Sequence, residues 1–98
     1  MPETTLNLNF YYSDDKEKKM ENKIAIIGIF IEDRENISQV NNLLHSFGDK
    51  IIGRMGIPYK AGGINVISVI IDATADEINS LTGKLGRLKG ISAKTMLS

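Results

Sequence analysis

The hydrophobic positions of the chain follow the same order twice. Each copy starts with a nearly continuous apolar run, continues with apolar residues three or four positions apart, and ends in a mixed segment. The copies match at a constant offset, so that Ile26 corresponds to Ile67 and Leu44 to Leu85. A continuous apolar run is typical of a buried strand, and the wider spacing is typical of an amphipathic helix. We therefore expect two strand–helix–strand units in tandem.

Four segments have strand character, and they fall into two kinds. Residues 24–31 and 64–72 are almost entirely apolar, as expected for central strands of a sheet. Residues 50–57 contain glycines and precede Pro58. In residues 91–96, the set Ile91, Ala93 and Thr95 alternates with the set Ser92, Lys94 and Met96. Both of these patterns favour edge strands.

Two helices are expected between the strands. The first begins with Asn36 as N-cap, paired with Gln39 in an arrangement like a capping box, and it ends at Gly48. The second begins with a clearer capping box formed by Thr74 and Glu77. Each helix has one apolar stripe that faces the core. The two stripes are Ile37, Val40, Leu44 and Phe47, and Ile78, Leu81, Leu85 and Leu88.

This order of elements predicts an α+β fold, a ferredoxin-like β-α-β-β-α-β sandwich with an antiparallel sheet of order 4-1-3-2. In that fold the helices cover one face of the sheet only, although both faces of the central strands are apolar here. Because the uncovered face needs a partner, we expect copies of the chain to associate sheet to sheet or edge to edge, giving a homodimer or a higher homo-oligomer. The residues assigned to this interface are Ile24, Ile26, Phe30, Ile64, Val66 and Ile70.

We divide the chain into an N-terminal extension, residues 1–21, and one domain, residues 22–98. The extension ends in a charged run and is expected to be flexible, or to be a translated leader ahead of a natural start at Met20. The alternation of Leu6, Leu8 and Phe10 also allows a short added strand.

Composition and charge exclude several kinds of function. The chain has no cysteine, one histidine, and equal numbers of acidic and basic residues, 12 of each. We therefore expect no metal site, no cofactor and no contact with nucleic acid. His45 is expected to be an exposed helix residue. Without a signal peptide or a long apolar run, we expect a cytoplasmic protein that does not bind membranes.

The acidic residues do not form a catalytic pair. Glu32 and Asp33 follow one central strand and Asp72 ends the other, so antiparallel pairing puts them at opposite ends of the sheet. We therefore predict that the protein is not an enzyme.

From Lys23 to Leu97, the chain resembles the regulators of the iron-only hydrogenase system, which are ACT-like domains related to the C-terminal domain of nickel-responsive repressors. The segments that carry this resemblance are 24–29 (IAIIGI), 32–35 (EDRE), 51–59 (IIGRMGIPY), 66–70 (VISVI) and 81–88 (LTGKLGRL). The resemblance implies a regulatory domain, such as a transcriptional regulator. It does not extend to nickel binding, because His45 is the single imidazole.

A ligand site is predicted in the mixed strand. Gly53 and Gly56 flank Arg54, and glycine inside a strand indicates that a ligand or another backbone approaches closely. The Arg54 guanidinium suits an anion, and Tyr59 and Lys60 on the adjoining hairpin would close over it. Alternatively, the glycines admit a neighbouring subunit.

Three further glycines, Gly83, Gly86 and Gly90, interrupt the second helix and its exit. We interpret them as residues that allow close packing and end the helix. The alternative is that they expose the backbone to an anion beside Lys84, Arg87 and Lys89. Taken together, the sequence predicts an oligomeric regulatory module that senses a small effector or a protein partner. The alternative is a ligand-free scaffold for interaction or assembly.

Overall fold

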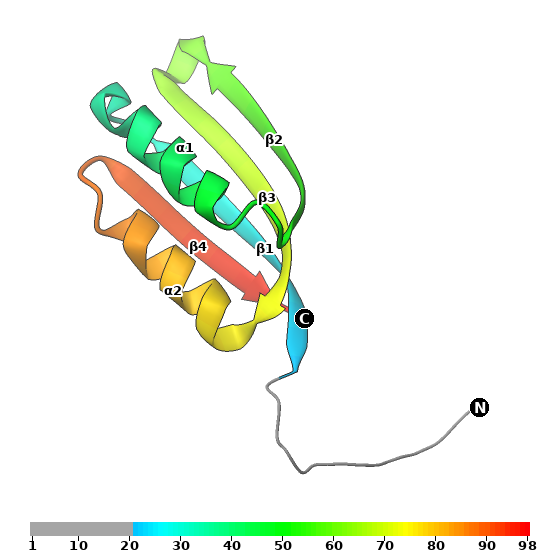
Figure 1. Ribbon diagram of the computed structural model, residues 1–98. Coiled ribbons are helices and arrows are strands. Elements are labelled where there is room, and N and C mark those ends of the chain that lie inside the picture. Colours follow the sequence, from blue (N-terminus) through cyan, green and yellow to red (C-terminus); the bar gives the residue numbers. More distant parts are fainter. Residues whose placement is uncertain (1–20) are drawn as a thin grey trace, which may run out of the picture.

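A computed structural model describes residues 21–98, so the predictions for residues 1–19 lie outside the described part of the chain. The elements follow the predicted order, with two short 3-10 turns in addition (Figure 1). They are β1 (Asn22–Ile31), η1 (Arg34–Asn36), α1 (Ile37–Ser46), β2 (Ile51–Tyr59), η2 (Lys60–Gly62), β3 (Ile64–Thr74), α2 (Ala75–Gly86) and β4 (Ile91–Leu97).

The four strands form one antiparallel sheet in the order β2-β3-β1-β4. Read from the other edge this is 4-1-3-2, so the predicted ferredoxin-like topology is confirmed. The apolar strands β1 and β3 are central, and the mixed strands β2 and β4 lie at the edges. Helices α1 and α2 lie side by side across one face of the sheet (Figure 1).

The core lies between the helices and the sheet, and it follows from the alternation of side chains along each strand. In β1 every second residue from Ala25 to Ile31 is buried, while the residues between them are exposed. The helices contribute their predicted stripes, of which Ile37, Phe47 and Leu88 are partly buried and the other residues are buried. The largest fully buried side chains are Ile27, Ile29, Ile31, Val40, Leu44, Val69, Ile71, Ile78, Leu81 and Leu85.

The start of α2 is as predicted. Thr74 Oγ1 accepts a hydrogen bond from the Glu77 backbone N–H at 3.2 Å, and Glu77 Oε1 accepts one from the Thr74 N–H at 3.0 Å. The hydrogen bond from the Thr74 backbone lowers the pKa of Glu77, against some desolvation, and the Thr74 hydroxyl and Lys50 lower it further. The side chain of each residue therefore accepts a hydrogen bond from the backbone N–H of the other, as in a capping box.

The start of α1 differs from the prediction. Asn36 is the N-cap, but its side chain caps nothing in its own helix, and the expected pairing with Gln39 is wrong. Instead, Asn36 Nδ2 donates to the backbone oxygen of Lys89 at 2.6 Å, because the loop after α2 lies next to this turn. The preceding turn, η1, is capped by Asp33, whose Oδ1 accepts from the Glu35 N–H at 3.0 Å.

The contact between the loop after α2 and the chain after β1 also explains why residue 90 is a glycine. The Glu32 N–H donates to the Gly90 carbonyl at 2.8 Å, which ties the end of β1 to the start of β4. Gly90 has a φ of 75°, and a Cβ placed on it would collide with Asp33. Both the backbone conformation and the close approach therefore require glycine here.

Candidate functional site

The face of the sheet that the helices leave open is apolar and exposed. All six residues predicted for an interface lie on it, because their cross-strand partners, such as Ile26 with Ile70 and Phe30 with Val66, share one side of the sheet. Ile26 is 45% exposed and Phe30 49%, whereas the alternate residues are buried under the helices. The pleat thus separates the two apolar faces as predicted.

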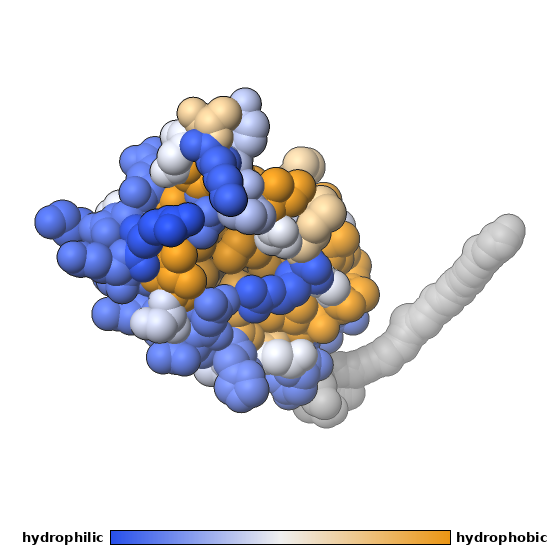
Figure 2. All heavy atoms as spheres, turned by 90° about the horizontal axis from the view of Figure 1, so that it is seen from above, coloured by the Kyte–Doolittle hydropathy of each residue, from blue (hydrophilic) through white to orange (hydrophobic). Residues whose placement is uncertain are grey.

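The open face is larger than the sequence prediction, because both edge strands add to it. In β2, Ile57 pairs with Val66 and Tyr59 with Ile64, and in β4, Met96 pairs with Ile26. Sequence periodicity alone missed these residues, since the strand register decides which side of β2 joins the face. Figure 2, which views the molecule from above, shows hydrophilic side chains on the left and hydrophobic ones in the middle and on the right, with some hydrophilic side chains lying across them.

The middle of the open face is hollow. Gly28 and Ser68 are paired there, and a Cβ on Gly28 would have no neighbour within 4 Å. A hollow of about 220 Å³ lies over Gly28, lined also by Phe30, Ser92 and Lys94. The face therefore has a shallow centre flanked by larger side chains.

A second site lies on the helix side of the edge strand. Arg54 pairs with Val69 and Gly56 with Ile67, both of which are buried under the helices. Arg54 Nη2 donates to Asn41 Oδ1 of α1 at 2.9 Å. Arg54 and Gly56 therefore line a hollow of about 200 Å³ between β2 and α1.

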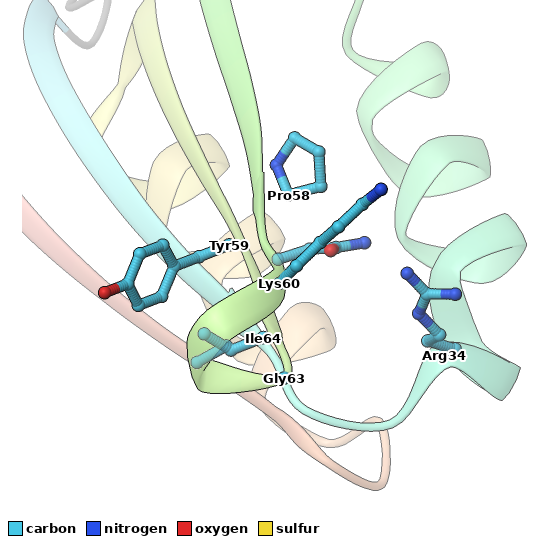
Figure 3. A pocket seen from close by; sticks show the side chains of 7 residues that line it. Arg34, Pro58, Tyr59, Lys60, Gly63 and Ile64 are labelled. Atoms are coloured by element: carbon cyan, nitrogen blue, oxygen red, sulfur yellow. The ribbon is translucent and has the colours of Figure 1, made fainter.

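A neighbouring hollow of about 220 Å³ continues this groove towards the hairpin. It is lined by Arg34 and Lys60, and it shares Pro58 and Asn65 with the first hollow. In Figure 3 the side chains of Arg34 and Lys60 extend into the gap between the hairpin and the start of α1. We call the two hollows together the β2–α1 groove.

The structure brings together only some of the residues predicted to bind a ligand. Arg54, Gly56, Tyr59 and Lys60 line the β2–α1 groove, but Gly53 pairs with Ile70 on the open face. The Tyr59 ring points away from Lys60 and Arg34 in Figure 3. The alternation along β2, shifted by a bulge between residues 51 and 53, puts Gly53 on the opposite side of the sheet from Arg54 and Gly56.

Three polar groove residues were not predicted, namely Arg34, Asn41 and Asn65. They lie far from Arg54 in the sequence, so only the pairing of β2 with β3 and the position of α1 bring them together. The one signal was the basic Arg34 within the segment 32–35 that carries the family resemblance.

Among residues 21–98, no three histidine, cysteine, aspartate or glutamate side chains lie close enough to hold a metal ion. His45 is exposed on α1, as predicted. The helices of the described part are too short or too polar to span a bilayer.

The fold and the sequence together define the class of protein. Residues 23–95 match the TM1266-like family, described as "Iron-only hydrogenase system regulator, putative", and the chain belongs to this family. The resemblance inferred from the sequence is thereby confirmed.

Among solved structures, the chain is similar to the uncharacterized protein TM1266 from Thermotoga maritima. The two are 37% identical with a TM-score of 0.76, over 79% of this chain and 98% of that one. None of the curated proteins matches this chain.

Proposed function

We propose that the protein is a cytoplasmic, non-enzymatic regulator of the iron-only hydrogenase system that works as a homodimer and senses a small effector. The description of its family supports the link to that system. The observation that carries the proposal is the exposed apolar face, to which all four strands contribute. Large apolar patches on small proteins are typical of interaction sites.

A second copy of this chain fits the open face. Among the cross-strand pairs on this face, Asp72 and Lys94 supply the charged side chains, one of each sign. Their charges cancel, so two copies related by a two-fold axis meet without net repulsion. Sheets that pack face to face lie about 10 Å apart, which large side chains such as Phe30 and Met96 are long enough to fill.

Strand β2 connects the open face to the β2–α1 groove. Gly56 faces the groove, while its neighbours Met55 and Ile57 point to the open side. A ligand that contacts β2 in the groove therefore acts on the strand that also forms the dimer interface. A ligand shifts the association of two subunits when its affinity for the dimer differs from its affinity for the monomer.

The alternative function is a ligand-free scaffold for assembly. The same apolar face supports it, because a different protein with an apolar surface would cover the face equally well. The two functions differ in what the isolated protein does in solution. A regulator of the proposed kind is a dimer by itself, whereas a scaffold for another protein is a monomer until that protein is added.

Sedimentation equilibrium of the full chain tests the dimer. We expect the wild type to be dimeric at micromolar concentration and Ile26→Asp to be monomeric with an unchanged circular dichroism spectrum. The matched control is Asn79→Asp, which adds the same charge to an exposed position of α2. A monomeric wild type contradicts the homodimer and favours the scaffold.

The regulatory role is tested in the organism that carries the gene. Deletion of the gene should change the level of hydrogenase transcripts, and the wild-type gene should restore it. The Ile26→Asp gene should not restore the level, while the Asn79→Asp gene should. Transcripts that do not change after deletion contradict the regulatory function.

A further inference from the structure

The described residues that line the β2–α1 groove carry positive charge and no negative charge. The residues that line it include Arg34, Arg54 and Lys60, and they include no aspartate or glutamate. Within residues 21–98 the ion pair is Lys50 with Glu77, so none of the three groove cations has a carboxylate partner in this part of the chain. A hollow lined by charges of one sign concentrates ions of the other sign.

The charges lie at two ends of the groove. Arg54 lines the hollow beside α1, whereas Arg34 and Lys60 line the hollow beside the hairpin. Pro58 and Asn65 belong to both hollows and so mark the place where they join. A molecule that fills both hollows therefore meets a cation at each end.

Arg54 is held in place for such a contact. One N–H of its guanidinium donates to Asn41 Oδ1 at 2.9 Å. A guanidinium has five N–H donors in one plane, so the remaining four are left to bind a carboxylate in a forked arrangement. The bond to Asn41 thus orients the group without using up its donors.

The floor of the groove is apolar. Ile31 and Ile67 are buried there, and Ile37 of α1 lies beside them. Asn65 is half-buried at the junction, and its side-chain amide makes no hydrogen bond to another described residue. The lining therefore offers an apolar surface between its charged ends and one amide for a polar group.

Gly56 keeps this space open. A Cβ on Gly56 would lie 3.8 Å from Ile67 Cγ1, which is an ordinary contact, and its φ is not positive. Neither packing nor backbone conformation requires glycine at this position, in contrast to Gly90. A larger side chain on this side of β2 would occupy the groove, since Gly56 pairs with Ile67 on the helix side.

From these contacts we infer that the groove binds a small dicarboxylate whose two acidic groups are joined by a short apolar chain. This rests on the proposed function, because it names the chemical class of the effector. Arg54 binds one carboxylate, Arg34 and Lys60 bind the other, and the chain lies on Ile31 and Ile67. The two volumes, about 200 and 220 Å³, are small for ligand pockets and match a small metabolite.

Isothermal titration calorimetry of the full chain at low salt tests this inference with succinate, glutarate and adipate. One of the three should bind saturably, because the distance between the cations selects one chain length. Glutaramide has the same shape as glutarate without the charges and should not bind. Inorganic phosphate should bind more weakly than the best dicarboxylate, since it reaches only one end of the groove.

Variants of the groove sharpen the test. Arg54→Gln and Lys60→Gln should each weaken binding of the best dicarboxylate about tenfold or more, the usual effect of losing a charge-assisted hydrogen bond. Gly56→Val should abolish binding while thermal unfolding stays unchanged. The control is Lys84→Gln, which removes one charge from α2, lines neither hollow and should bind as the wild type does.

Three results overturn the inference. They are the absence of saturable binding by any of the three dicarboxylates, phosphate binding as tight as the best dicarboxylate, and equal losses in Arg54→Gln and Lys84→Gln. Sedimentation of the same samples separates this failure from that of the proposed dimer. A dimer without dicarboxylate binding refutes the groove alone, and a monomer that binds dicarboxylate refutes the dimer alone.

Discussion

The two faces of the sheet have similar side chains and very different surroundings. On the helix side, the isoleucines of β1 and β3 are almost completely buried, as Ile29 is at 0% exposure. On the open side the same residue type is about half exposed, as Ile26 is at 45%. Composition therefore does not tell the core from the open face. Only the positions of the two helices do.

The largest expected effect comes from placing the same charge on each face. Ile29→Asp puts an unpaired carboxylate under the helices, which we expect to cost more than about 4 kcal/mol and to unfold most of the protein. Ile26→Asp puts it on the open face, where water solvates it in the monomer, so the protein should stay folded. Circular dichroism and urea unfolding measure both. Equal loss of structure in the two variants would show that the open face is also needed for folding.

Two glycines extend the comparison to the backbone. Gly90→Ala forces a side chain into Asp33 at a positive φ, which we expect to cost about 1–3 kcal/mol. Gly28→Ala adds a methyl group to empty space on the open face and should be neutral or stabilise by up to about 1 kcal/mol.

Both glycine changes are best made in the Ile26→Asp protein, so that self-association does not contribute to the urea midpoint. A loss of stability in Gly28→Ala as large as that in Gly90→Ala contradicts the claim that the open face is free in the monomer.

Gly90 shows which features of the fold could not be predicted from the sequence. The order of the strands, the helix stripes and the capping box at Thr74 follow from local patterns, and the structure confirms them. Gly90 was interpreted as a packing or helix-ending residue, but its contact with Asp33 depends on two loops that meet only in the fold. Local patterns cannot report such a meeting.

The same limit applies to the candidate sites. Arg54 could be selected from the sequence because of its charge and its position between two glycines in an edge strand, and Lys60 because of its charge and its place on the adjoining hairpin. Asn41 could not, because its bond to Arg54 depends on where α1 crosses the sheet. Tyr59 was grouped with Lys60 by adjacency, and both residues line the hollow beside the hairpin, although the Tyr59 ring points away from Lys60 in Figure 3.

The hydrogen bonds at the start of α2 give a smaller effect on the helix side. Thr74→Ala removes the hydroxyl that caps the Glu77 N–H, which should cost about 1 kcal/mol. The matched change on the open side is Ser92→Ala, at an exposed position of β4, which should change the free energy of unfolding by less than about 0.5 kcal/mol. Urea unfolding at neutral pH checks both. Equal losses would mean that the cap at Thr74 adds nothing.

The smallest effect is the dependence of stability on pH that Glu77 produces on the helix side. Hydrogen bonds from Thr74 and the ion pair with Lys50, at 3.5 Å, favour the charged form of Glu77, so its pKa is lower in the folded protein than in the unfolded chain. A lowered pKa stabilises the fold above the unfolded pKa, and this contribution is lost as the pH falls through the folded pKa.

Glu77→Gln keeps a side chain that suits the capping box but does not titrate. We therefore expect the stability difference between wild type and Glu77→Gln to be largest near pH 7 and to shrink towards pH 3, as followed by urea unfolding at each pH. A difference that stays constant over this range would show that the Glu77 charge does not stabilise α2, and that the helix side owes its stability to apolar packing and neutral hydrogen bonds.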